Sequence, residues 1–261
     1  MKKIIALVLA LIMVFTVFAG CGKKDDVADS KYVANNGKLV VGITDFAPMD
    51  YKDANGKWIG FDADMATAFA KSLGVEVEFV EINWDNKAME LEAKNIDCVW
   101  NGMTLTDEVK SAMSTSNPYF NNAQVVVVKK EEADKYKTAE DCKALSFAVE
   151  AGSAGKDQAV ANGFTYTEVV DQATTLSEVK SGTSDAAIID FLMAISMTGE
   201  GTGYADLTYT AKLNSEEYGV GFRKNSDLTE KLNDFFKTAY ADGTMKKIAE
   251  TYGIAEQLIA Q

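Results

Sequence analysis

One carboxylate in the chain occupies a position where it could bind a cation. Asp190 directly follows the apolar residues 186–189 (AAII), which are predicted to form a buried strand. A carboxylate at the end of such a strand can bind an ammonium group through charge-assisted hydrogen bonds. Aspartate also caps the N-termini of helices, and a helix is predicted directly afterwards, over 191–198. The residue pattern by itself leaves cation binding and helix capping equally open.

Two aromatic residues are candidates for the walls of a binding site. Phe46 lies beside Asp45 in a loop predicted over 45–50 around Pro48, and we expect this loop to contribute to a site. Trp84 begins a helix predicted over 84–94. Aromatic faces bury apolar groups and attract ammonium ions. For Trp84, packing in the core is an equally good interpretation.

Small and polar residues follow or precede other predicted elements. Asn101, Gly102 and Thr104 come just after a strand predicted over 96–100, and Gly102 would let a ligand approach the backbone closely. Ser153 precedes a helix predicted over 154–161, whose free N–H groups can hold an anion. Ser153 also suits the N-cap of that helix, and the two roles are compatible.

Several kinds of chemistry are disfavoured by residues that the sequence lacks. The 261 residues contain no histidine and no C-x-x-C motif, so we predict no metal, no cofactor and no Ser–His or Cys–His catalytic pair. Cys98 and Cys142 could pair outside the cell, but two unpaired, buried cysteines are the favoured interpretation. The net charge of −13 argues against nucleic acid and against an anionic membrane surface as partners.

The candidate residues lie at the ends of elements that alternate between strand and helix. This alternation predicts an α/β fold with parallel sheets and helices on both faces, in which ligands bind beyond the carboxyl ends of the strands. A T-x-x-E capping box from Thr175 to Glu178 predicts a helix that starts there. The other predictions are strands at 38–43, 75–82, 125–128, 146–149, 165–170 and 218–222, and helices at 62–73, 227–241 and 244–252.

The N-terminus has the pattern of an exported protein. Two lysines, an apolar run over 4–18 and two small residues precede Cys21, and the run is shorter than the about 20 residues that span a bilayer. A cysteine at this point resembles the lipobox of bacterial lipoproteins, which implies removal of residues 1–20 and diacylation of the Cys21 thiol. An ordinary secretory signal beside a cysteine is the alternative. Residues 21–30 are predicted to be a lipid-bearing polar tether.

Nine short blocks occur in order along the chain: 45–49 (DFAPM), 60–64 (GFDAD), 95–97 (NID), 101–106 (NGMTLT), 117–119 (NPY), 152–153 (GS), 184–190 (SDAAIID), 219–223 (GVGFR) and 242–244 (DGT). Together they resemble the polar amino-acid-binding proteins of ABC importers, solute-binding protein family 3. The resemblance covers about residues 38–252. It implies a two-lobed periplasmic-binding-protein-like fold of type II with a ligand cleft between the lobes. Two crossing strands would join lobe 1 (31–121 plus 213–261) to lobe 2 (122–212).

The resemblance also implies roles for the candidate residues. The family aspartate that matches Asp190 binds the α-ammonium group of the ligand, and the position of Trp84 lies near the ligand side chain. Backbone groups and a small hydroxyl at the positions of Asn101, Gly102 and Thr104 bind the ligand as well. The implied ligand-binding residues are Asp45, Phe46, Trp84, Asn101, Gly102, Thr104, Ser153 and Asp190.

One departure from the family pattern concerns the ligand. Most members have an arginine that grips the α-carboxylate with two hydrogen bonds, and Val109 stands at that position here. Lys110 follows, but one residue along a helix turns a side chain by about 100°, so we expect Lys110 to be a solvated surface residue. The single arginine, Arg223, matches a position near the hinge. The ligand therefore either keeps a carboxylate, held by Ser153, Thr104 and helix N–H groups, or lacks one.

The function that the resemblance implies is extracytoplasmic binding of an amino acid or small polar amine. The protein would be a lipid-anchored monomer that delivers its ligand to the permease of an ABC importer. A cleft enzyme of the dehydratase type is the alternative on the same fold, with Glu150 as general acid. A ligand-sensing partner of a membrane receptor is a third interpretation.

Overall fold

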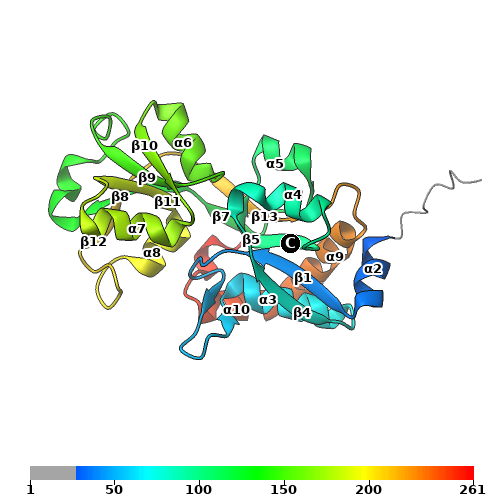
Figure 1. The fold of residues 1–261 in the computed structure, drawn as a ribbon. Coiled ribbons are helices and arrows are strands. Elements are labelled where there is room, and N and C mark those ends of the chain that lie inside the picture. Colours follow the sequence, from blue (N-terminus) through cyan, green and yellow to red (C-terminus); the bar gives the residue numbers. More distant parts are fainter. Residues whose placement is uncertain (1–27) are drawn as a thin grey trace, which may run out of the picture.

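The computed structural model describes residues 28–261 as two lobes, each built on one main β-sheet with helices on both faces (Figure 1). The predicted signal peptide, Cys21 and residues 21–27 of the predicted tether lie outside the described residues. Asp29 and Ser30, the last tether residues, instead belong to helix α2 (Asp29–Asn36). Ser30 donates a backbone hydrogen bond to Asp227, and Asp29 pairs with Arg223. These long-range partners fix both residues to the folded body, so their assignment to a tether is wrong.

The sheet of lobe 1 has the strand order β4-β1-β5-β13-β6, with β7 paired to β13. Strand β1 lies parallel to β4 and β5, whereas β13 is antiparallel to β5, β6 and β7. The strands are β1 (Lys38–Ile43), β4 (Glu76–Glu81), β5 (Cys98–Thr104), β6 (Ser114–Thr115), β7 (Phe120–Asn122) and β13 (Glu216–Phe222), beside the hairpin β2 (Tyr51–Lys52) and β3 (Trp58–Ile59). The other helices are α3 (Phe61–Ser72), η1 (Trp84–Asn86), α4 (Lys87–Glu92), α5 (Asp107–Ala112), α9 (Leu228–Ala241), α10 (Thr244–Thr251) and η3 (Ala255–Gln257).

The sheet of lobe 2 has the strand order β10-β9-β11-β8-β12. Strands β9, β10 and β11 are parallel, and β8 is antiparallel to both of its neighbours. The strands are β8 (Gln124–Lys129), β9 (Ser146–Glu150), β10 (Thr165–Val169), β11 (Ala186–Asp190) and β12 (Leu207–Lys212). The helices are η2 (Lys130–Lys135), α6 (Ala154–Asn162), α7 (Gln172–Ser181) and α8 (Phe191–Met197).

Strand β8 explains why this sheet must be covered on both sides. Its four consecutive valines are all buried, and they alternate between two hydrophobic clusters. Val125 and Val127 pack with residues of α7 and α8, whereas Val126 and Val128 pack on the face that carries α6. Because successive side chains of a strand point to opposite faces, a continuous apolar run predicts this two-sided burial.

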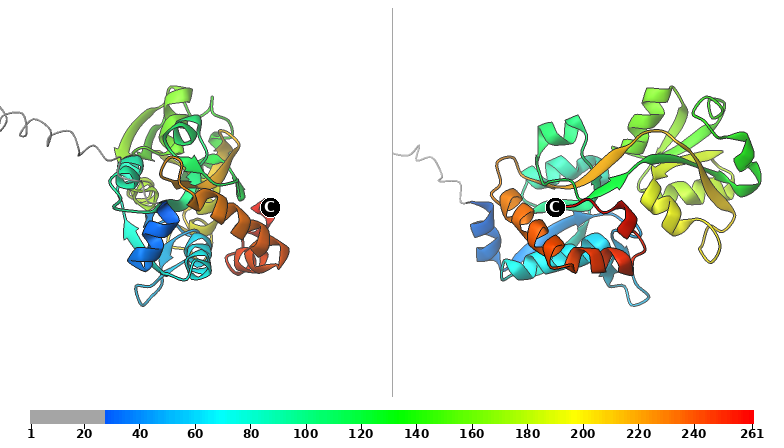
Figure 2. Two further views of the ribbon diagram at one scale, coloured as in Figure 1. Left: turned by 90° about the vertical axis from the view of Figure 1, so that its right-hand side faces the viewer. Right: turned by 180° about the vertical axis from the view of Figure 1, so that it is seen from behind.

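The two lobes are joined by strands that pass directly from one sheet to the other. The chain leaves β7 for β8 and returns from β12 to β13, and Figure 2 shows both passages in the view from behind. The prediction of parallel sheets is therefore wrong for β8, β12 and β13. A parallel neighbour needs a long crossover, whereas β8 and β13 are each reached from the opposite lobe without a helix. Strand β12 follows α8 within lobe 2 and pairs antiparallel with β8. The α/β two-lobed fold itself is confirmed.

One helix start differs from its prediction. Helix α7 begins three residues before Thr175, because Asp171 accepts the backbone N–H of Thr174 and caps the helix. Thr175 is buried inside the first turn, and its hydroxyl donates to the backbone carbonyl of Gln172. The T-x-x-E pattern is thus present without acting as a capping box, since a stronger aspartate cap lies upstream.

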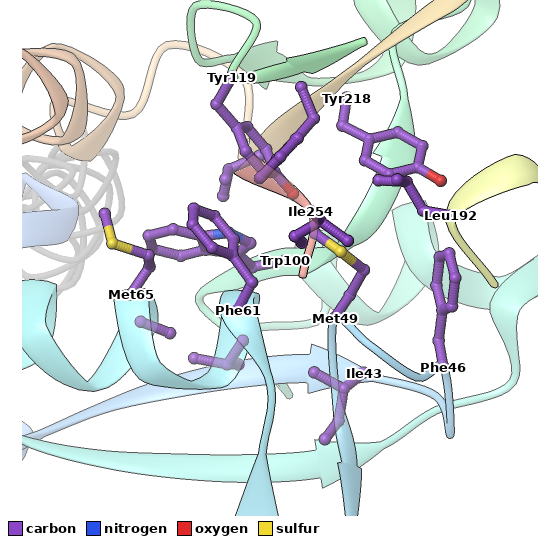
Figure 3. Close-up of a cluster of buried hydrophobic side chains, with 14 of the residues drawn as sticks. Ile43, Phe46, Met49, Phe61, Met65, Trp100, Tyr119, Leu192, Tyr218 and Ile254 are labelled. Carbon is purple, nitrogen blue, oxygen red and sulfur yellow. The ribbon is translucent and has the colours of Figure 1, made fainter. Parts of the chain in front are cut away.

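A cluster of large side chains lies under the cleft in lobe 1 (Figure 3). Phe61 and Tyr119 stack with ring centroids 6.0 Å apart, and Trp100 packs edge-on against Phe236. Phe46 and Tyr218 lie at the margin of this cluster, beside Leu192 of lobe 2 (Figure 3). The core of lobe 1 therefore reaches the boundary between the lobes, where the candidate site is found.

Candidate functional site

A cavity of about 240 Å³ lies between the lobes and is walled by both. This volume is slightly below the usual range of about 300–1,000 Å³ for small-molecule sites, which suits a ligand of few atoms. Lobe 1 contributes Thr44, Phe46, Trp84, Asp85, Lys87, Ala88, Asn101, Gly102, Met103, Thr104, Thr106, Glu108, Val109, Ala112 and Met113. Lobe 2 contributes Glu150, Gly152, Ser153, Ala154, Lys156, Asp157, Gln172 and Asp190.

Asp190 lies in this cavity at the end of β11, with 3% of its surface exposed. Its Oδ1 accepts hydrogen bonds from the Tyr218 hydroxyl and Asn122 Nδ2, and its Oδ2 accepts one from Gln172 Nε2, each at 2.5 Å. A carboxylate has about four acceptor positions, so one remains for a ligand. The side chain does not cap helix α8; Asn122 accepts the N–H of Leu192 instead. The helix-capping interpretation is therefore wrong.

The surroundings of Asp190 do not neutralise its charge. All three hydrogen-bond donors are neutral side chains. Burial, followed by repulsion from Glu216, raises the pKa of Asp190 to about 7, although the bonds from Tyr218 and Gln172 oppose this. A cationic ligand group would favour the charged form, because an opposite charge within a few ångströms lowers the pKa of an acid.

A second buried acid, Glu150, lines the cavity at the end of β9. It is 2% exposed, and its Oε1 has no hydrogen-bond partner. Burial and the nearby negative charges of Asp190 and Asp171 raise the pKa of Glu150 well above its ordinary value. An unpartnered buried carboxyl oxygen beside a second carboxylate is costly unless a donor or a cation enters the cavity.

Lys87 connects the two lobes at one side of the cavity. Its Nζ donates to the Gly152 carbonyl oxygen at 2.9 Å and to the Trp84 carbonyl oxygen at 3.2 Å, and it lies 4.9 Å from the centroid of the Trp84 ring. Burial lowers the pKa of Lys87. Gly152 fits tightly against lobe 1, because a Cβ atom there would come within 2.5 Å of Asp85 Oδ1. The lobes are thus in direct contact, and the cleft is closed along this side.

The two predicted aromatic residues both line the cavity. Phe46 is buried and packs edge-on against Tyr218, with ring centroids 6.3 Å apart. Trp84 is also buried, and it belongs to the hydrophobic cluster of α4 and α5. Each ring therefore serves the core with one part and the cavity with another, so the two interpretations of the sequence are compatible.

The predicted polar residues line the cavity, but they are largely engaged with the protein. Asn101 accepts hydrogen bonds from Thr44 and donates to Asp50. The N–H of Gly102 donates to Asp62, and at its φ of 55° a Cβ would come within 2.5 Å of the Phe46 ring. These two residues therefore position the cavity wall.

The hydroxyl groups of the predicted site residues Thr104 and Ser153 also form hydrogen bonds within the protein. Thr104 donates to Glu216, and Ser153 caps α6 by accepting the N–H of Lys156 while donating to the Glu150 carbonyl oxygen. The predicted N-cap of α6 is therefore present. A ligand carboxylate would have to displace bonds that these two hydroxyl groups already make.

Asp45 is the one predicted site residue that the structure does not bring to the cavity. It is exposed and absent from the cavity lining. Partial burial, followed by repulsion from Asp171 and Glu81, raises the pKa of Asp45. Thr44, its neighbour, lines the cavity instead, because alternate residues of an extended chain point to opposite sides.

Lys110, which follows the position of the usual carboxylate-binding arginine, is a surface residue as predicted. Val109 lines the cavity and is 8% exposed, and Lys110 is exposed and absent from the lining. Arg223 lies inside lobe 1, where it binds Asp29 and Asp97. None of these residues places a guanidinium or ammonium group in the cavity.

Sequence reasoning missed Gln172 and the charged residues of the cavity mouth. Gln172 holds Asp190 through two bonds, since its Oε1 also accepts the Asp190 N–H at 3.0 Å. Lys87, Glu108 and Asp157 are charged residues of helices, a pattern typical of solvated surface. Only the closure of two lobes around them makes them cavity residues, and no local pattern contains that information.

Possible metal sites, membrane-spanning helices and disulfides were searched for among the described residues. Across 28–261, no group of three or more acidic, cysteine or histidine residues is arranged to hold a metal ion. No helix within that range is long and apolar enough to cross a membrane. Cys98 and Cys142 are free and buried, which fits their prediction as unpaired residues.

Comparisons with known proteins agree with this fold. A family model described as bacterial extracellular solute-binding proteins, family 3, matches residues 39–255. The chain is 28% identical to the arginine-binding extracellular protein ArtP of Bacillus subtilis, over 98% of this chain and 100% of that protein.

Two solved structures show the same architecture. A mutant of ArgBP from T. maritima superposes with a TM-score of 0.80 at 32% identity, and covers 86% of this chain and 98% of its own. The ancestral amino acid-binding protein AncCDT-1, a precursor of cyclohexadienyl dehydratase, has a TM-score of 0.78 at 33% identity, over 85% of this chain and 98% of its own.

Proposed function

The chain belongs to family 3 of the bacterial extracellular solute-binding proteins, and from this premise we propose that it is the substrate-binding protein of an ABC importer. It binds an amino acid or a related small polar amine in the cavity between its lobes. Closure of the cleft around the ligand produces the shape that the permease subunits recognise, and the ligand is then delivered to them.

The observation that carries this proposal is the cavity walled by both lobes, with Asp190 on one side and the rings of Phe46 and Trp84 on the other. A ligand that contacts both walls binds the closed form more tightly than the open form, because half of its contacts are missing in the open form. Such differential binding shifts the population toward closure, whereas a ligand that contacted one lobe alone would shift nothing.

In this proposal, Asp190 binds the positive group of the ligand, and Phe46 and Trp84 flank its apolar part. Asn101, Gly102, Thr104 and Ser153 form the polar wall. Lobe 1 comprises residues 31–121 and 213–261 and lobe 2 comprises residues 122–212. The assignment of β8–β12 to one sheet and the remaining long strands to another supports this division.

We propose further that the mature protein is a monomeric lipoprotein on the extracytoplasmic face of the cell membrane. The apolar run before Cys21 supports export, and two acyl chains on that thiol give stable anchoring where one would not. Metabolic labelling with an alkyne palmitate tests this directly. The wild-type chain should be labelled and should sediment with membranes, and the Cys21→Ala variant should do neither. Labelling of both chains, or of neither, contradicts the anchor.

A second candidate function is supported by the relation to a dehydratase precursor and by the raised pKa of Glu150. A protonated glutamic acid in a cavity can act as a general acid. We nonetheless propose that the protein is not an enzyme, because its cavity lining contains no arginine for the carboxylates of such a substrate. Incubation with prephenate and ultraviolet spectroscopy tests this: a protein-dependent spectral change, lost in Glu150→Gln, would establish the enzymatic alternative.

The proposed binding function is tested by a thermal-shift screen of amino acids and amines, followed by small-angle X-ray scattering. At least one compound should raise the melting temperature, because a ligand that binds only the folded state stabilises it by mass action. The same compound should reduce the radius of gyration. A protein that stays equally extended with every stabilising compound would contradict cleft closure.

A further inference from the structure

The charges that line the cavity are mostly negative. Five lining residues are acids (Asp85, Glu108, Glu150, Asp157 and Asp190), and two are lysines (Lys87 and Lys156). If the cavity is the ligand site proposed above, on which this inference rests, then this balance constrains the ligand. A site presents charges opposite to those of the molecule it binds.

Neither lysine is available to a ligand carboxylate. Lys87 Nζ donates to the carbonyl oxygens of Gly152 and Trp84 and thereby holds the lobes together. Lys156 Nζ pairs with Glu168 at 2.9 Å, on the side of α6 next to β10. Val109 also lines the cavity and offers only methyl groups. An incoming carboxylate would therefore find no unengaged cation in the cavity wall.

The inner end of the cavity requires a positive group instead. Glu150 Oε1 is buried without a hydrogen-bond partner, and the carboxylate of Asp190 is balanced by neutral donors alone. The two residues end the neighbouring parallel strands β9 and β11. One ammonium group between them has enough donors to serve the free Glu150 oxygen and the open acceptor position of Asp190.

The outer end of the cavity is acidic as well. Glu108 and Asp157 line it and are exposed, so they mark its mouth. They come from opposite lobes, from the first turns of α5 and α6. Partial burial, followed by repulsion from Glu108, raises the pKa of Asp157, although Lys87 and Lys156 oppose this. The N-terminus of α6 is already complemented by Asp157 and by the Ser153 cap, so it does not call for an anionic ligand group.

The cavity lining also has an apolar part. Phe46, Trp84, Ala88, Val109 and Met113 supply it. Such a wall buries methylene groups, and its rings attract the charged ends of an alkylamine.

We propose that the ligand is a small organic dication without a carboxylate, such as a linear alkyl diamine or a guanidinoalkyl amine. Its inner ammonium group lies between Asp190 and Glu150, its methylene chain lies along Phe46, Trp84 and Val109, and its outer positive group lies between Glu108 and Asp157. The ligand bridges the lobes by charge at both ends.

Three pairs of compounds that differ only by a carboxylate test the proposal: cadaverine and lysine, putrescine and ornithine, agmatine and arginine. The amine of at least one pair should bind at least tenfold more tightly than its amino acid in titration calorimetry. Amino acids that bind as tightly as their amines, or more tightly, overturn this inference and leave the proposed function standing. If none of the six compounds, no other amino acid and no other amine stabilises the protein, the proposed function fails together with it.

Two variants sharpen the test. Glu150→Gln keeps the shape and removes the inner charge, so it should weaken diamine binding at least tenfold, whereas the matched change Glu131→Gln on exposed η2 should leave binding unchanged. Val109→Arg should reverse the preference within the pairs, because a guanidinium on this wall repels the dication and binds a carboxylate. Equal binding of diamines by wild type and Glu150→Gln, with Glu131→Gln as the reference, contradicts the inner position of the ammonium group.

Discussion

Two buried aspartates of this protein have nearly the same environment and belong to different functions. In lobe 1, Asp62 accepts the Tyr119 hydroxyl at 2.8 Å, and burial raises its pKa to about 7. At the cleft, Asp190 accepts the Tyr218 hydroxyl at 2.5 Å, and its pKa is raised to about 7, again mainly by burial. Both carboxylates are almost inaccessible to solvent.

The difference lies in what else surrounds each carboxylate. Asp62 also binds the backbone N–H of Gly102 and does not line the cavity, so its hydrogen bonds stay inside lobe 1. The donors to Asp190 are three side chains from the crossing strands and from lobe 2, and the cavity meets its remaining side. A raised pKa therefore does not distinguish the two aspartates; the access of Asp190 to a cavity between two lobes is what supports its proposed role as the ligand-binding acid.

The largest expected effect separates these aspartates by substitution. Asp190→Asn should weaken ligand binding by at least about 100-fold, since breaking a buried charge pair costs about 3–5 kcal/mol. It keeps an oxygen for Tyr218, so the circular dichroism spectrum should not change. Titration calorimetry with the best compound of the screen measures the loss.

The matched variant is Asp62→Asn. It should leave ligand affinity within about threefold of wild type, because Asp62 lies outside the cavity. Its effect should appear in the melting temperature, through the bonds to Gly102 and Tyr119. If Asp62→Asn and Asp190→Asn reduced affinity equally, the assignment of Asp190 as the ligand-binding acid would have to be abandoned.

Substitution of the tyrosines that donate to the two aspartates, Tyr218 to Asp190 and Tyr119 to Asp62, should give the same kind of difference with a smaller magnitude. Tyr218→Phe removes a donor that favours the charged form of Asp190, so affinity at neutral pH should fall about tenfold, which corresponds to the lower end of the about 1.5–3 kcal/mol for a hydrogen bond to a charged group. Tyr119→Phe should lower only the unfolding free energy, measured in urea. Equal losses of affinity would indicate that both tyrosines act through packing.

Much of the fold could be predicted from sequence, because the relevant signals are local. The run KLVVGI predicts β1 with its bounds, and apolar spacing predicts α3 within one residue at each end. Strand β12 was not predicted, and Thr175 was taken for a helix start. Strand β12 depends on its pairing with the distant β8, whereas the start of α7 is set by the upstream cap Asp171.

The residues of the candidate site could likewise be predicted only in part. Asp190, Phe46 and Trp84 stand at the ends or starts of predictable elements, and the structure brings all three to the cavity. Asp45 is adjacent to Phe46 in sequence but points out of the cavity. Gln172 could not be found, because its role requires the position of α7 relative to β11. Sequence patterns therefore predicted the candidate residues at the ends of helices and strands. The remaining residues follow only from how these elements pack against one another.

A change of pH should affect folding stability and ligand affinity in opposite senses. The affinity should change by at most tenfold per pH unit. Asp62 and Asp190 have pKa values near 7 when folded, against an ordinary value of 3.8. The folded state thus holds more protons than the unfolded state between about pH 4 and 7, and the free energy of unfolding falls as pH rises through this window. Affinity for a cation should change in the opposite sense, rising from pH 6 to pH 8 as Asp190 ionises.

The same measurements on Asp190→Asn provide the control for this pH effect. The remaining pH dependence of its melting temperature should come from Asp62 and from the other buried acids with raised pKa values, Asp50 and Glu150, while any weak residual binding should lose the part of its pH dependence that Asp190 supplies. An affinity for the cation that decreases from pH 6 to pH 8 in the wild-type protein would contradict charge pairing at Asp190.

Two glycines allow a similar comparison of a backbone position at the cleft with one away from it. Their substitution should have the smallest effect on ligand affinity. Gly152 and Gly163 have nearly the same φ, 68° and 67°, so alanine is similarly strained at both, by about 1 kcal/mol. A Cβ at Gly152 would come within 2.5 Å of Asp85 across the cleft, whereas a Cβ at Gly163 would meet nothing within 4 Å. Both variants should lose similar stability, but only Gly152→Ala should also weaken ligand binding several-fold and enlarge the radius of gyration of the liganded protein. Because the strain is matched, a loss of affinity in both variants would mean that the Gly152 contact does not contribute to the closed form.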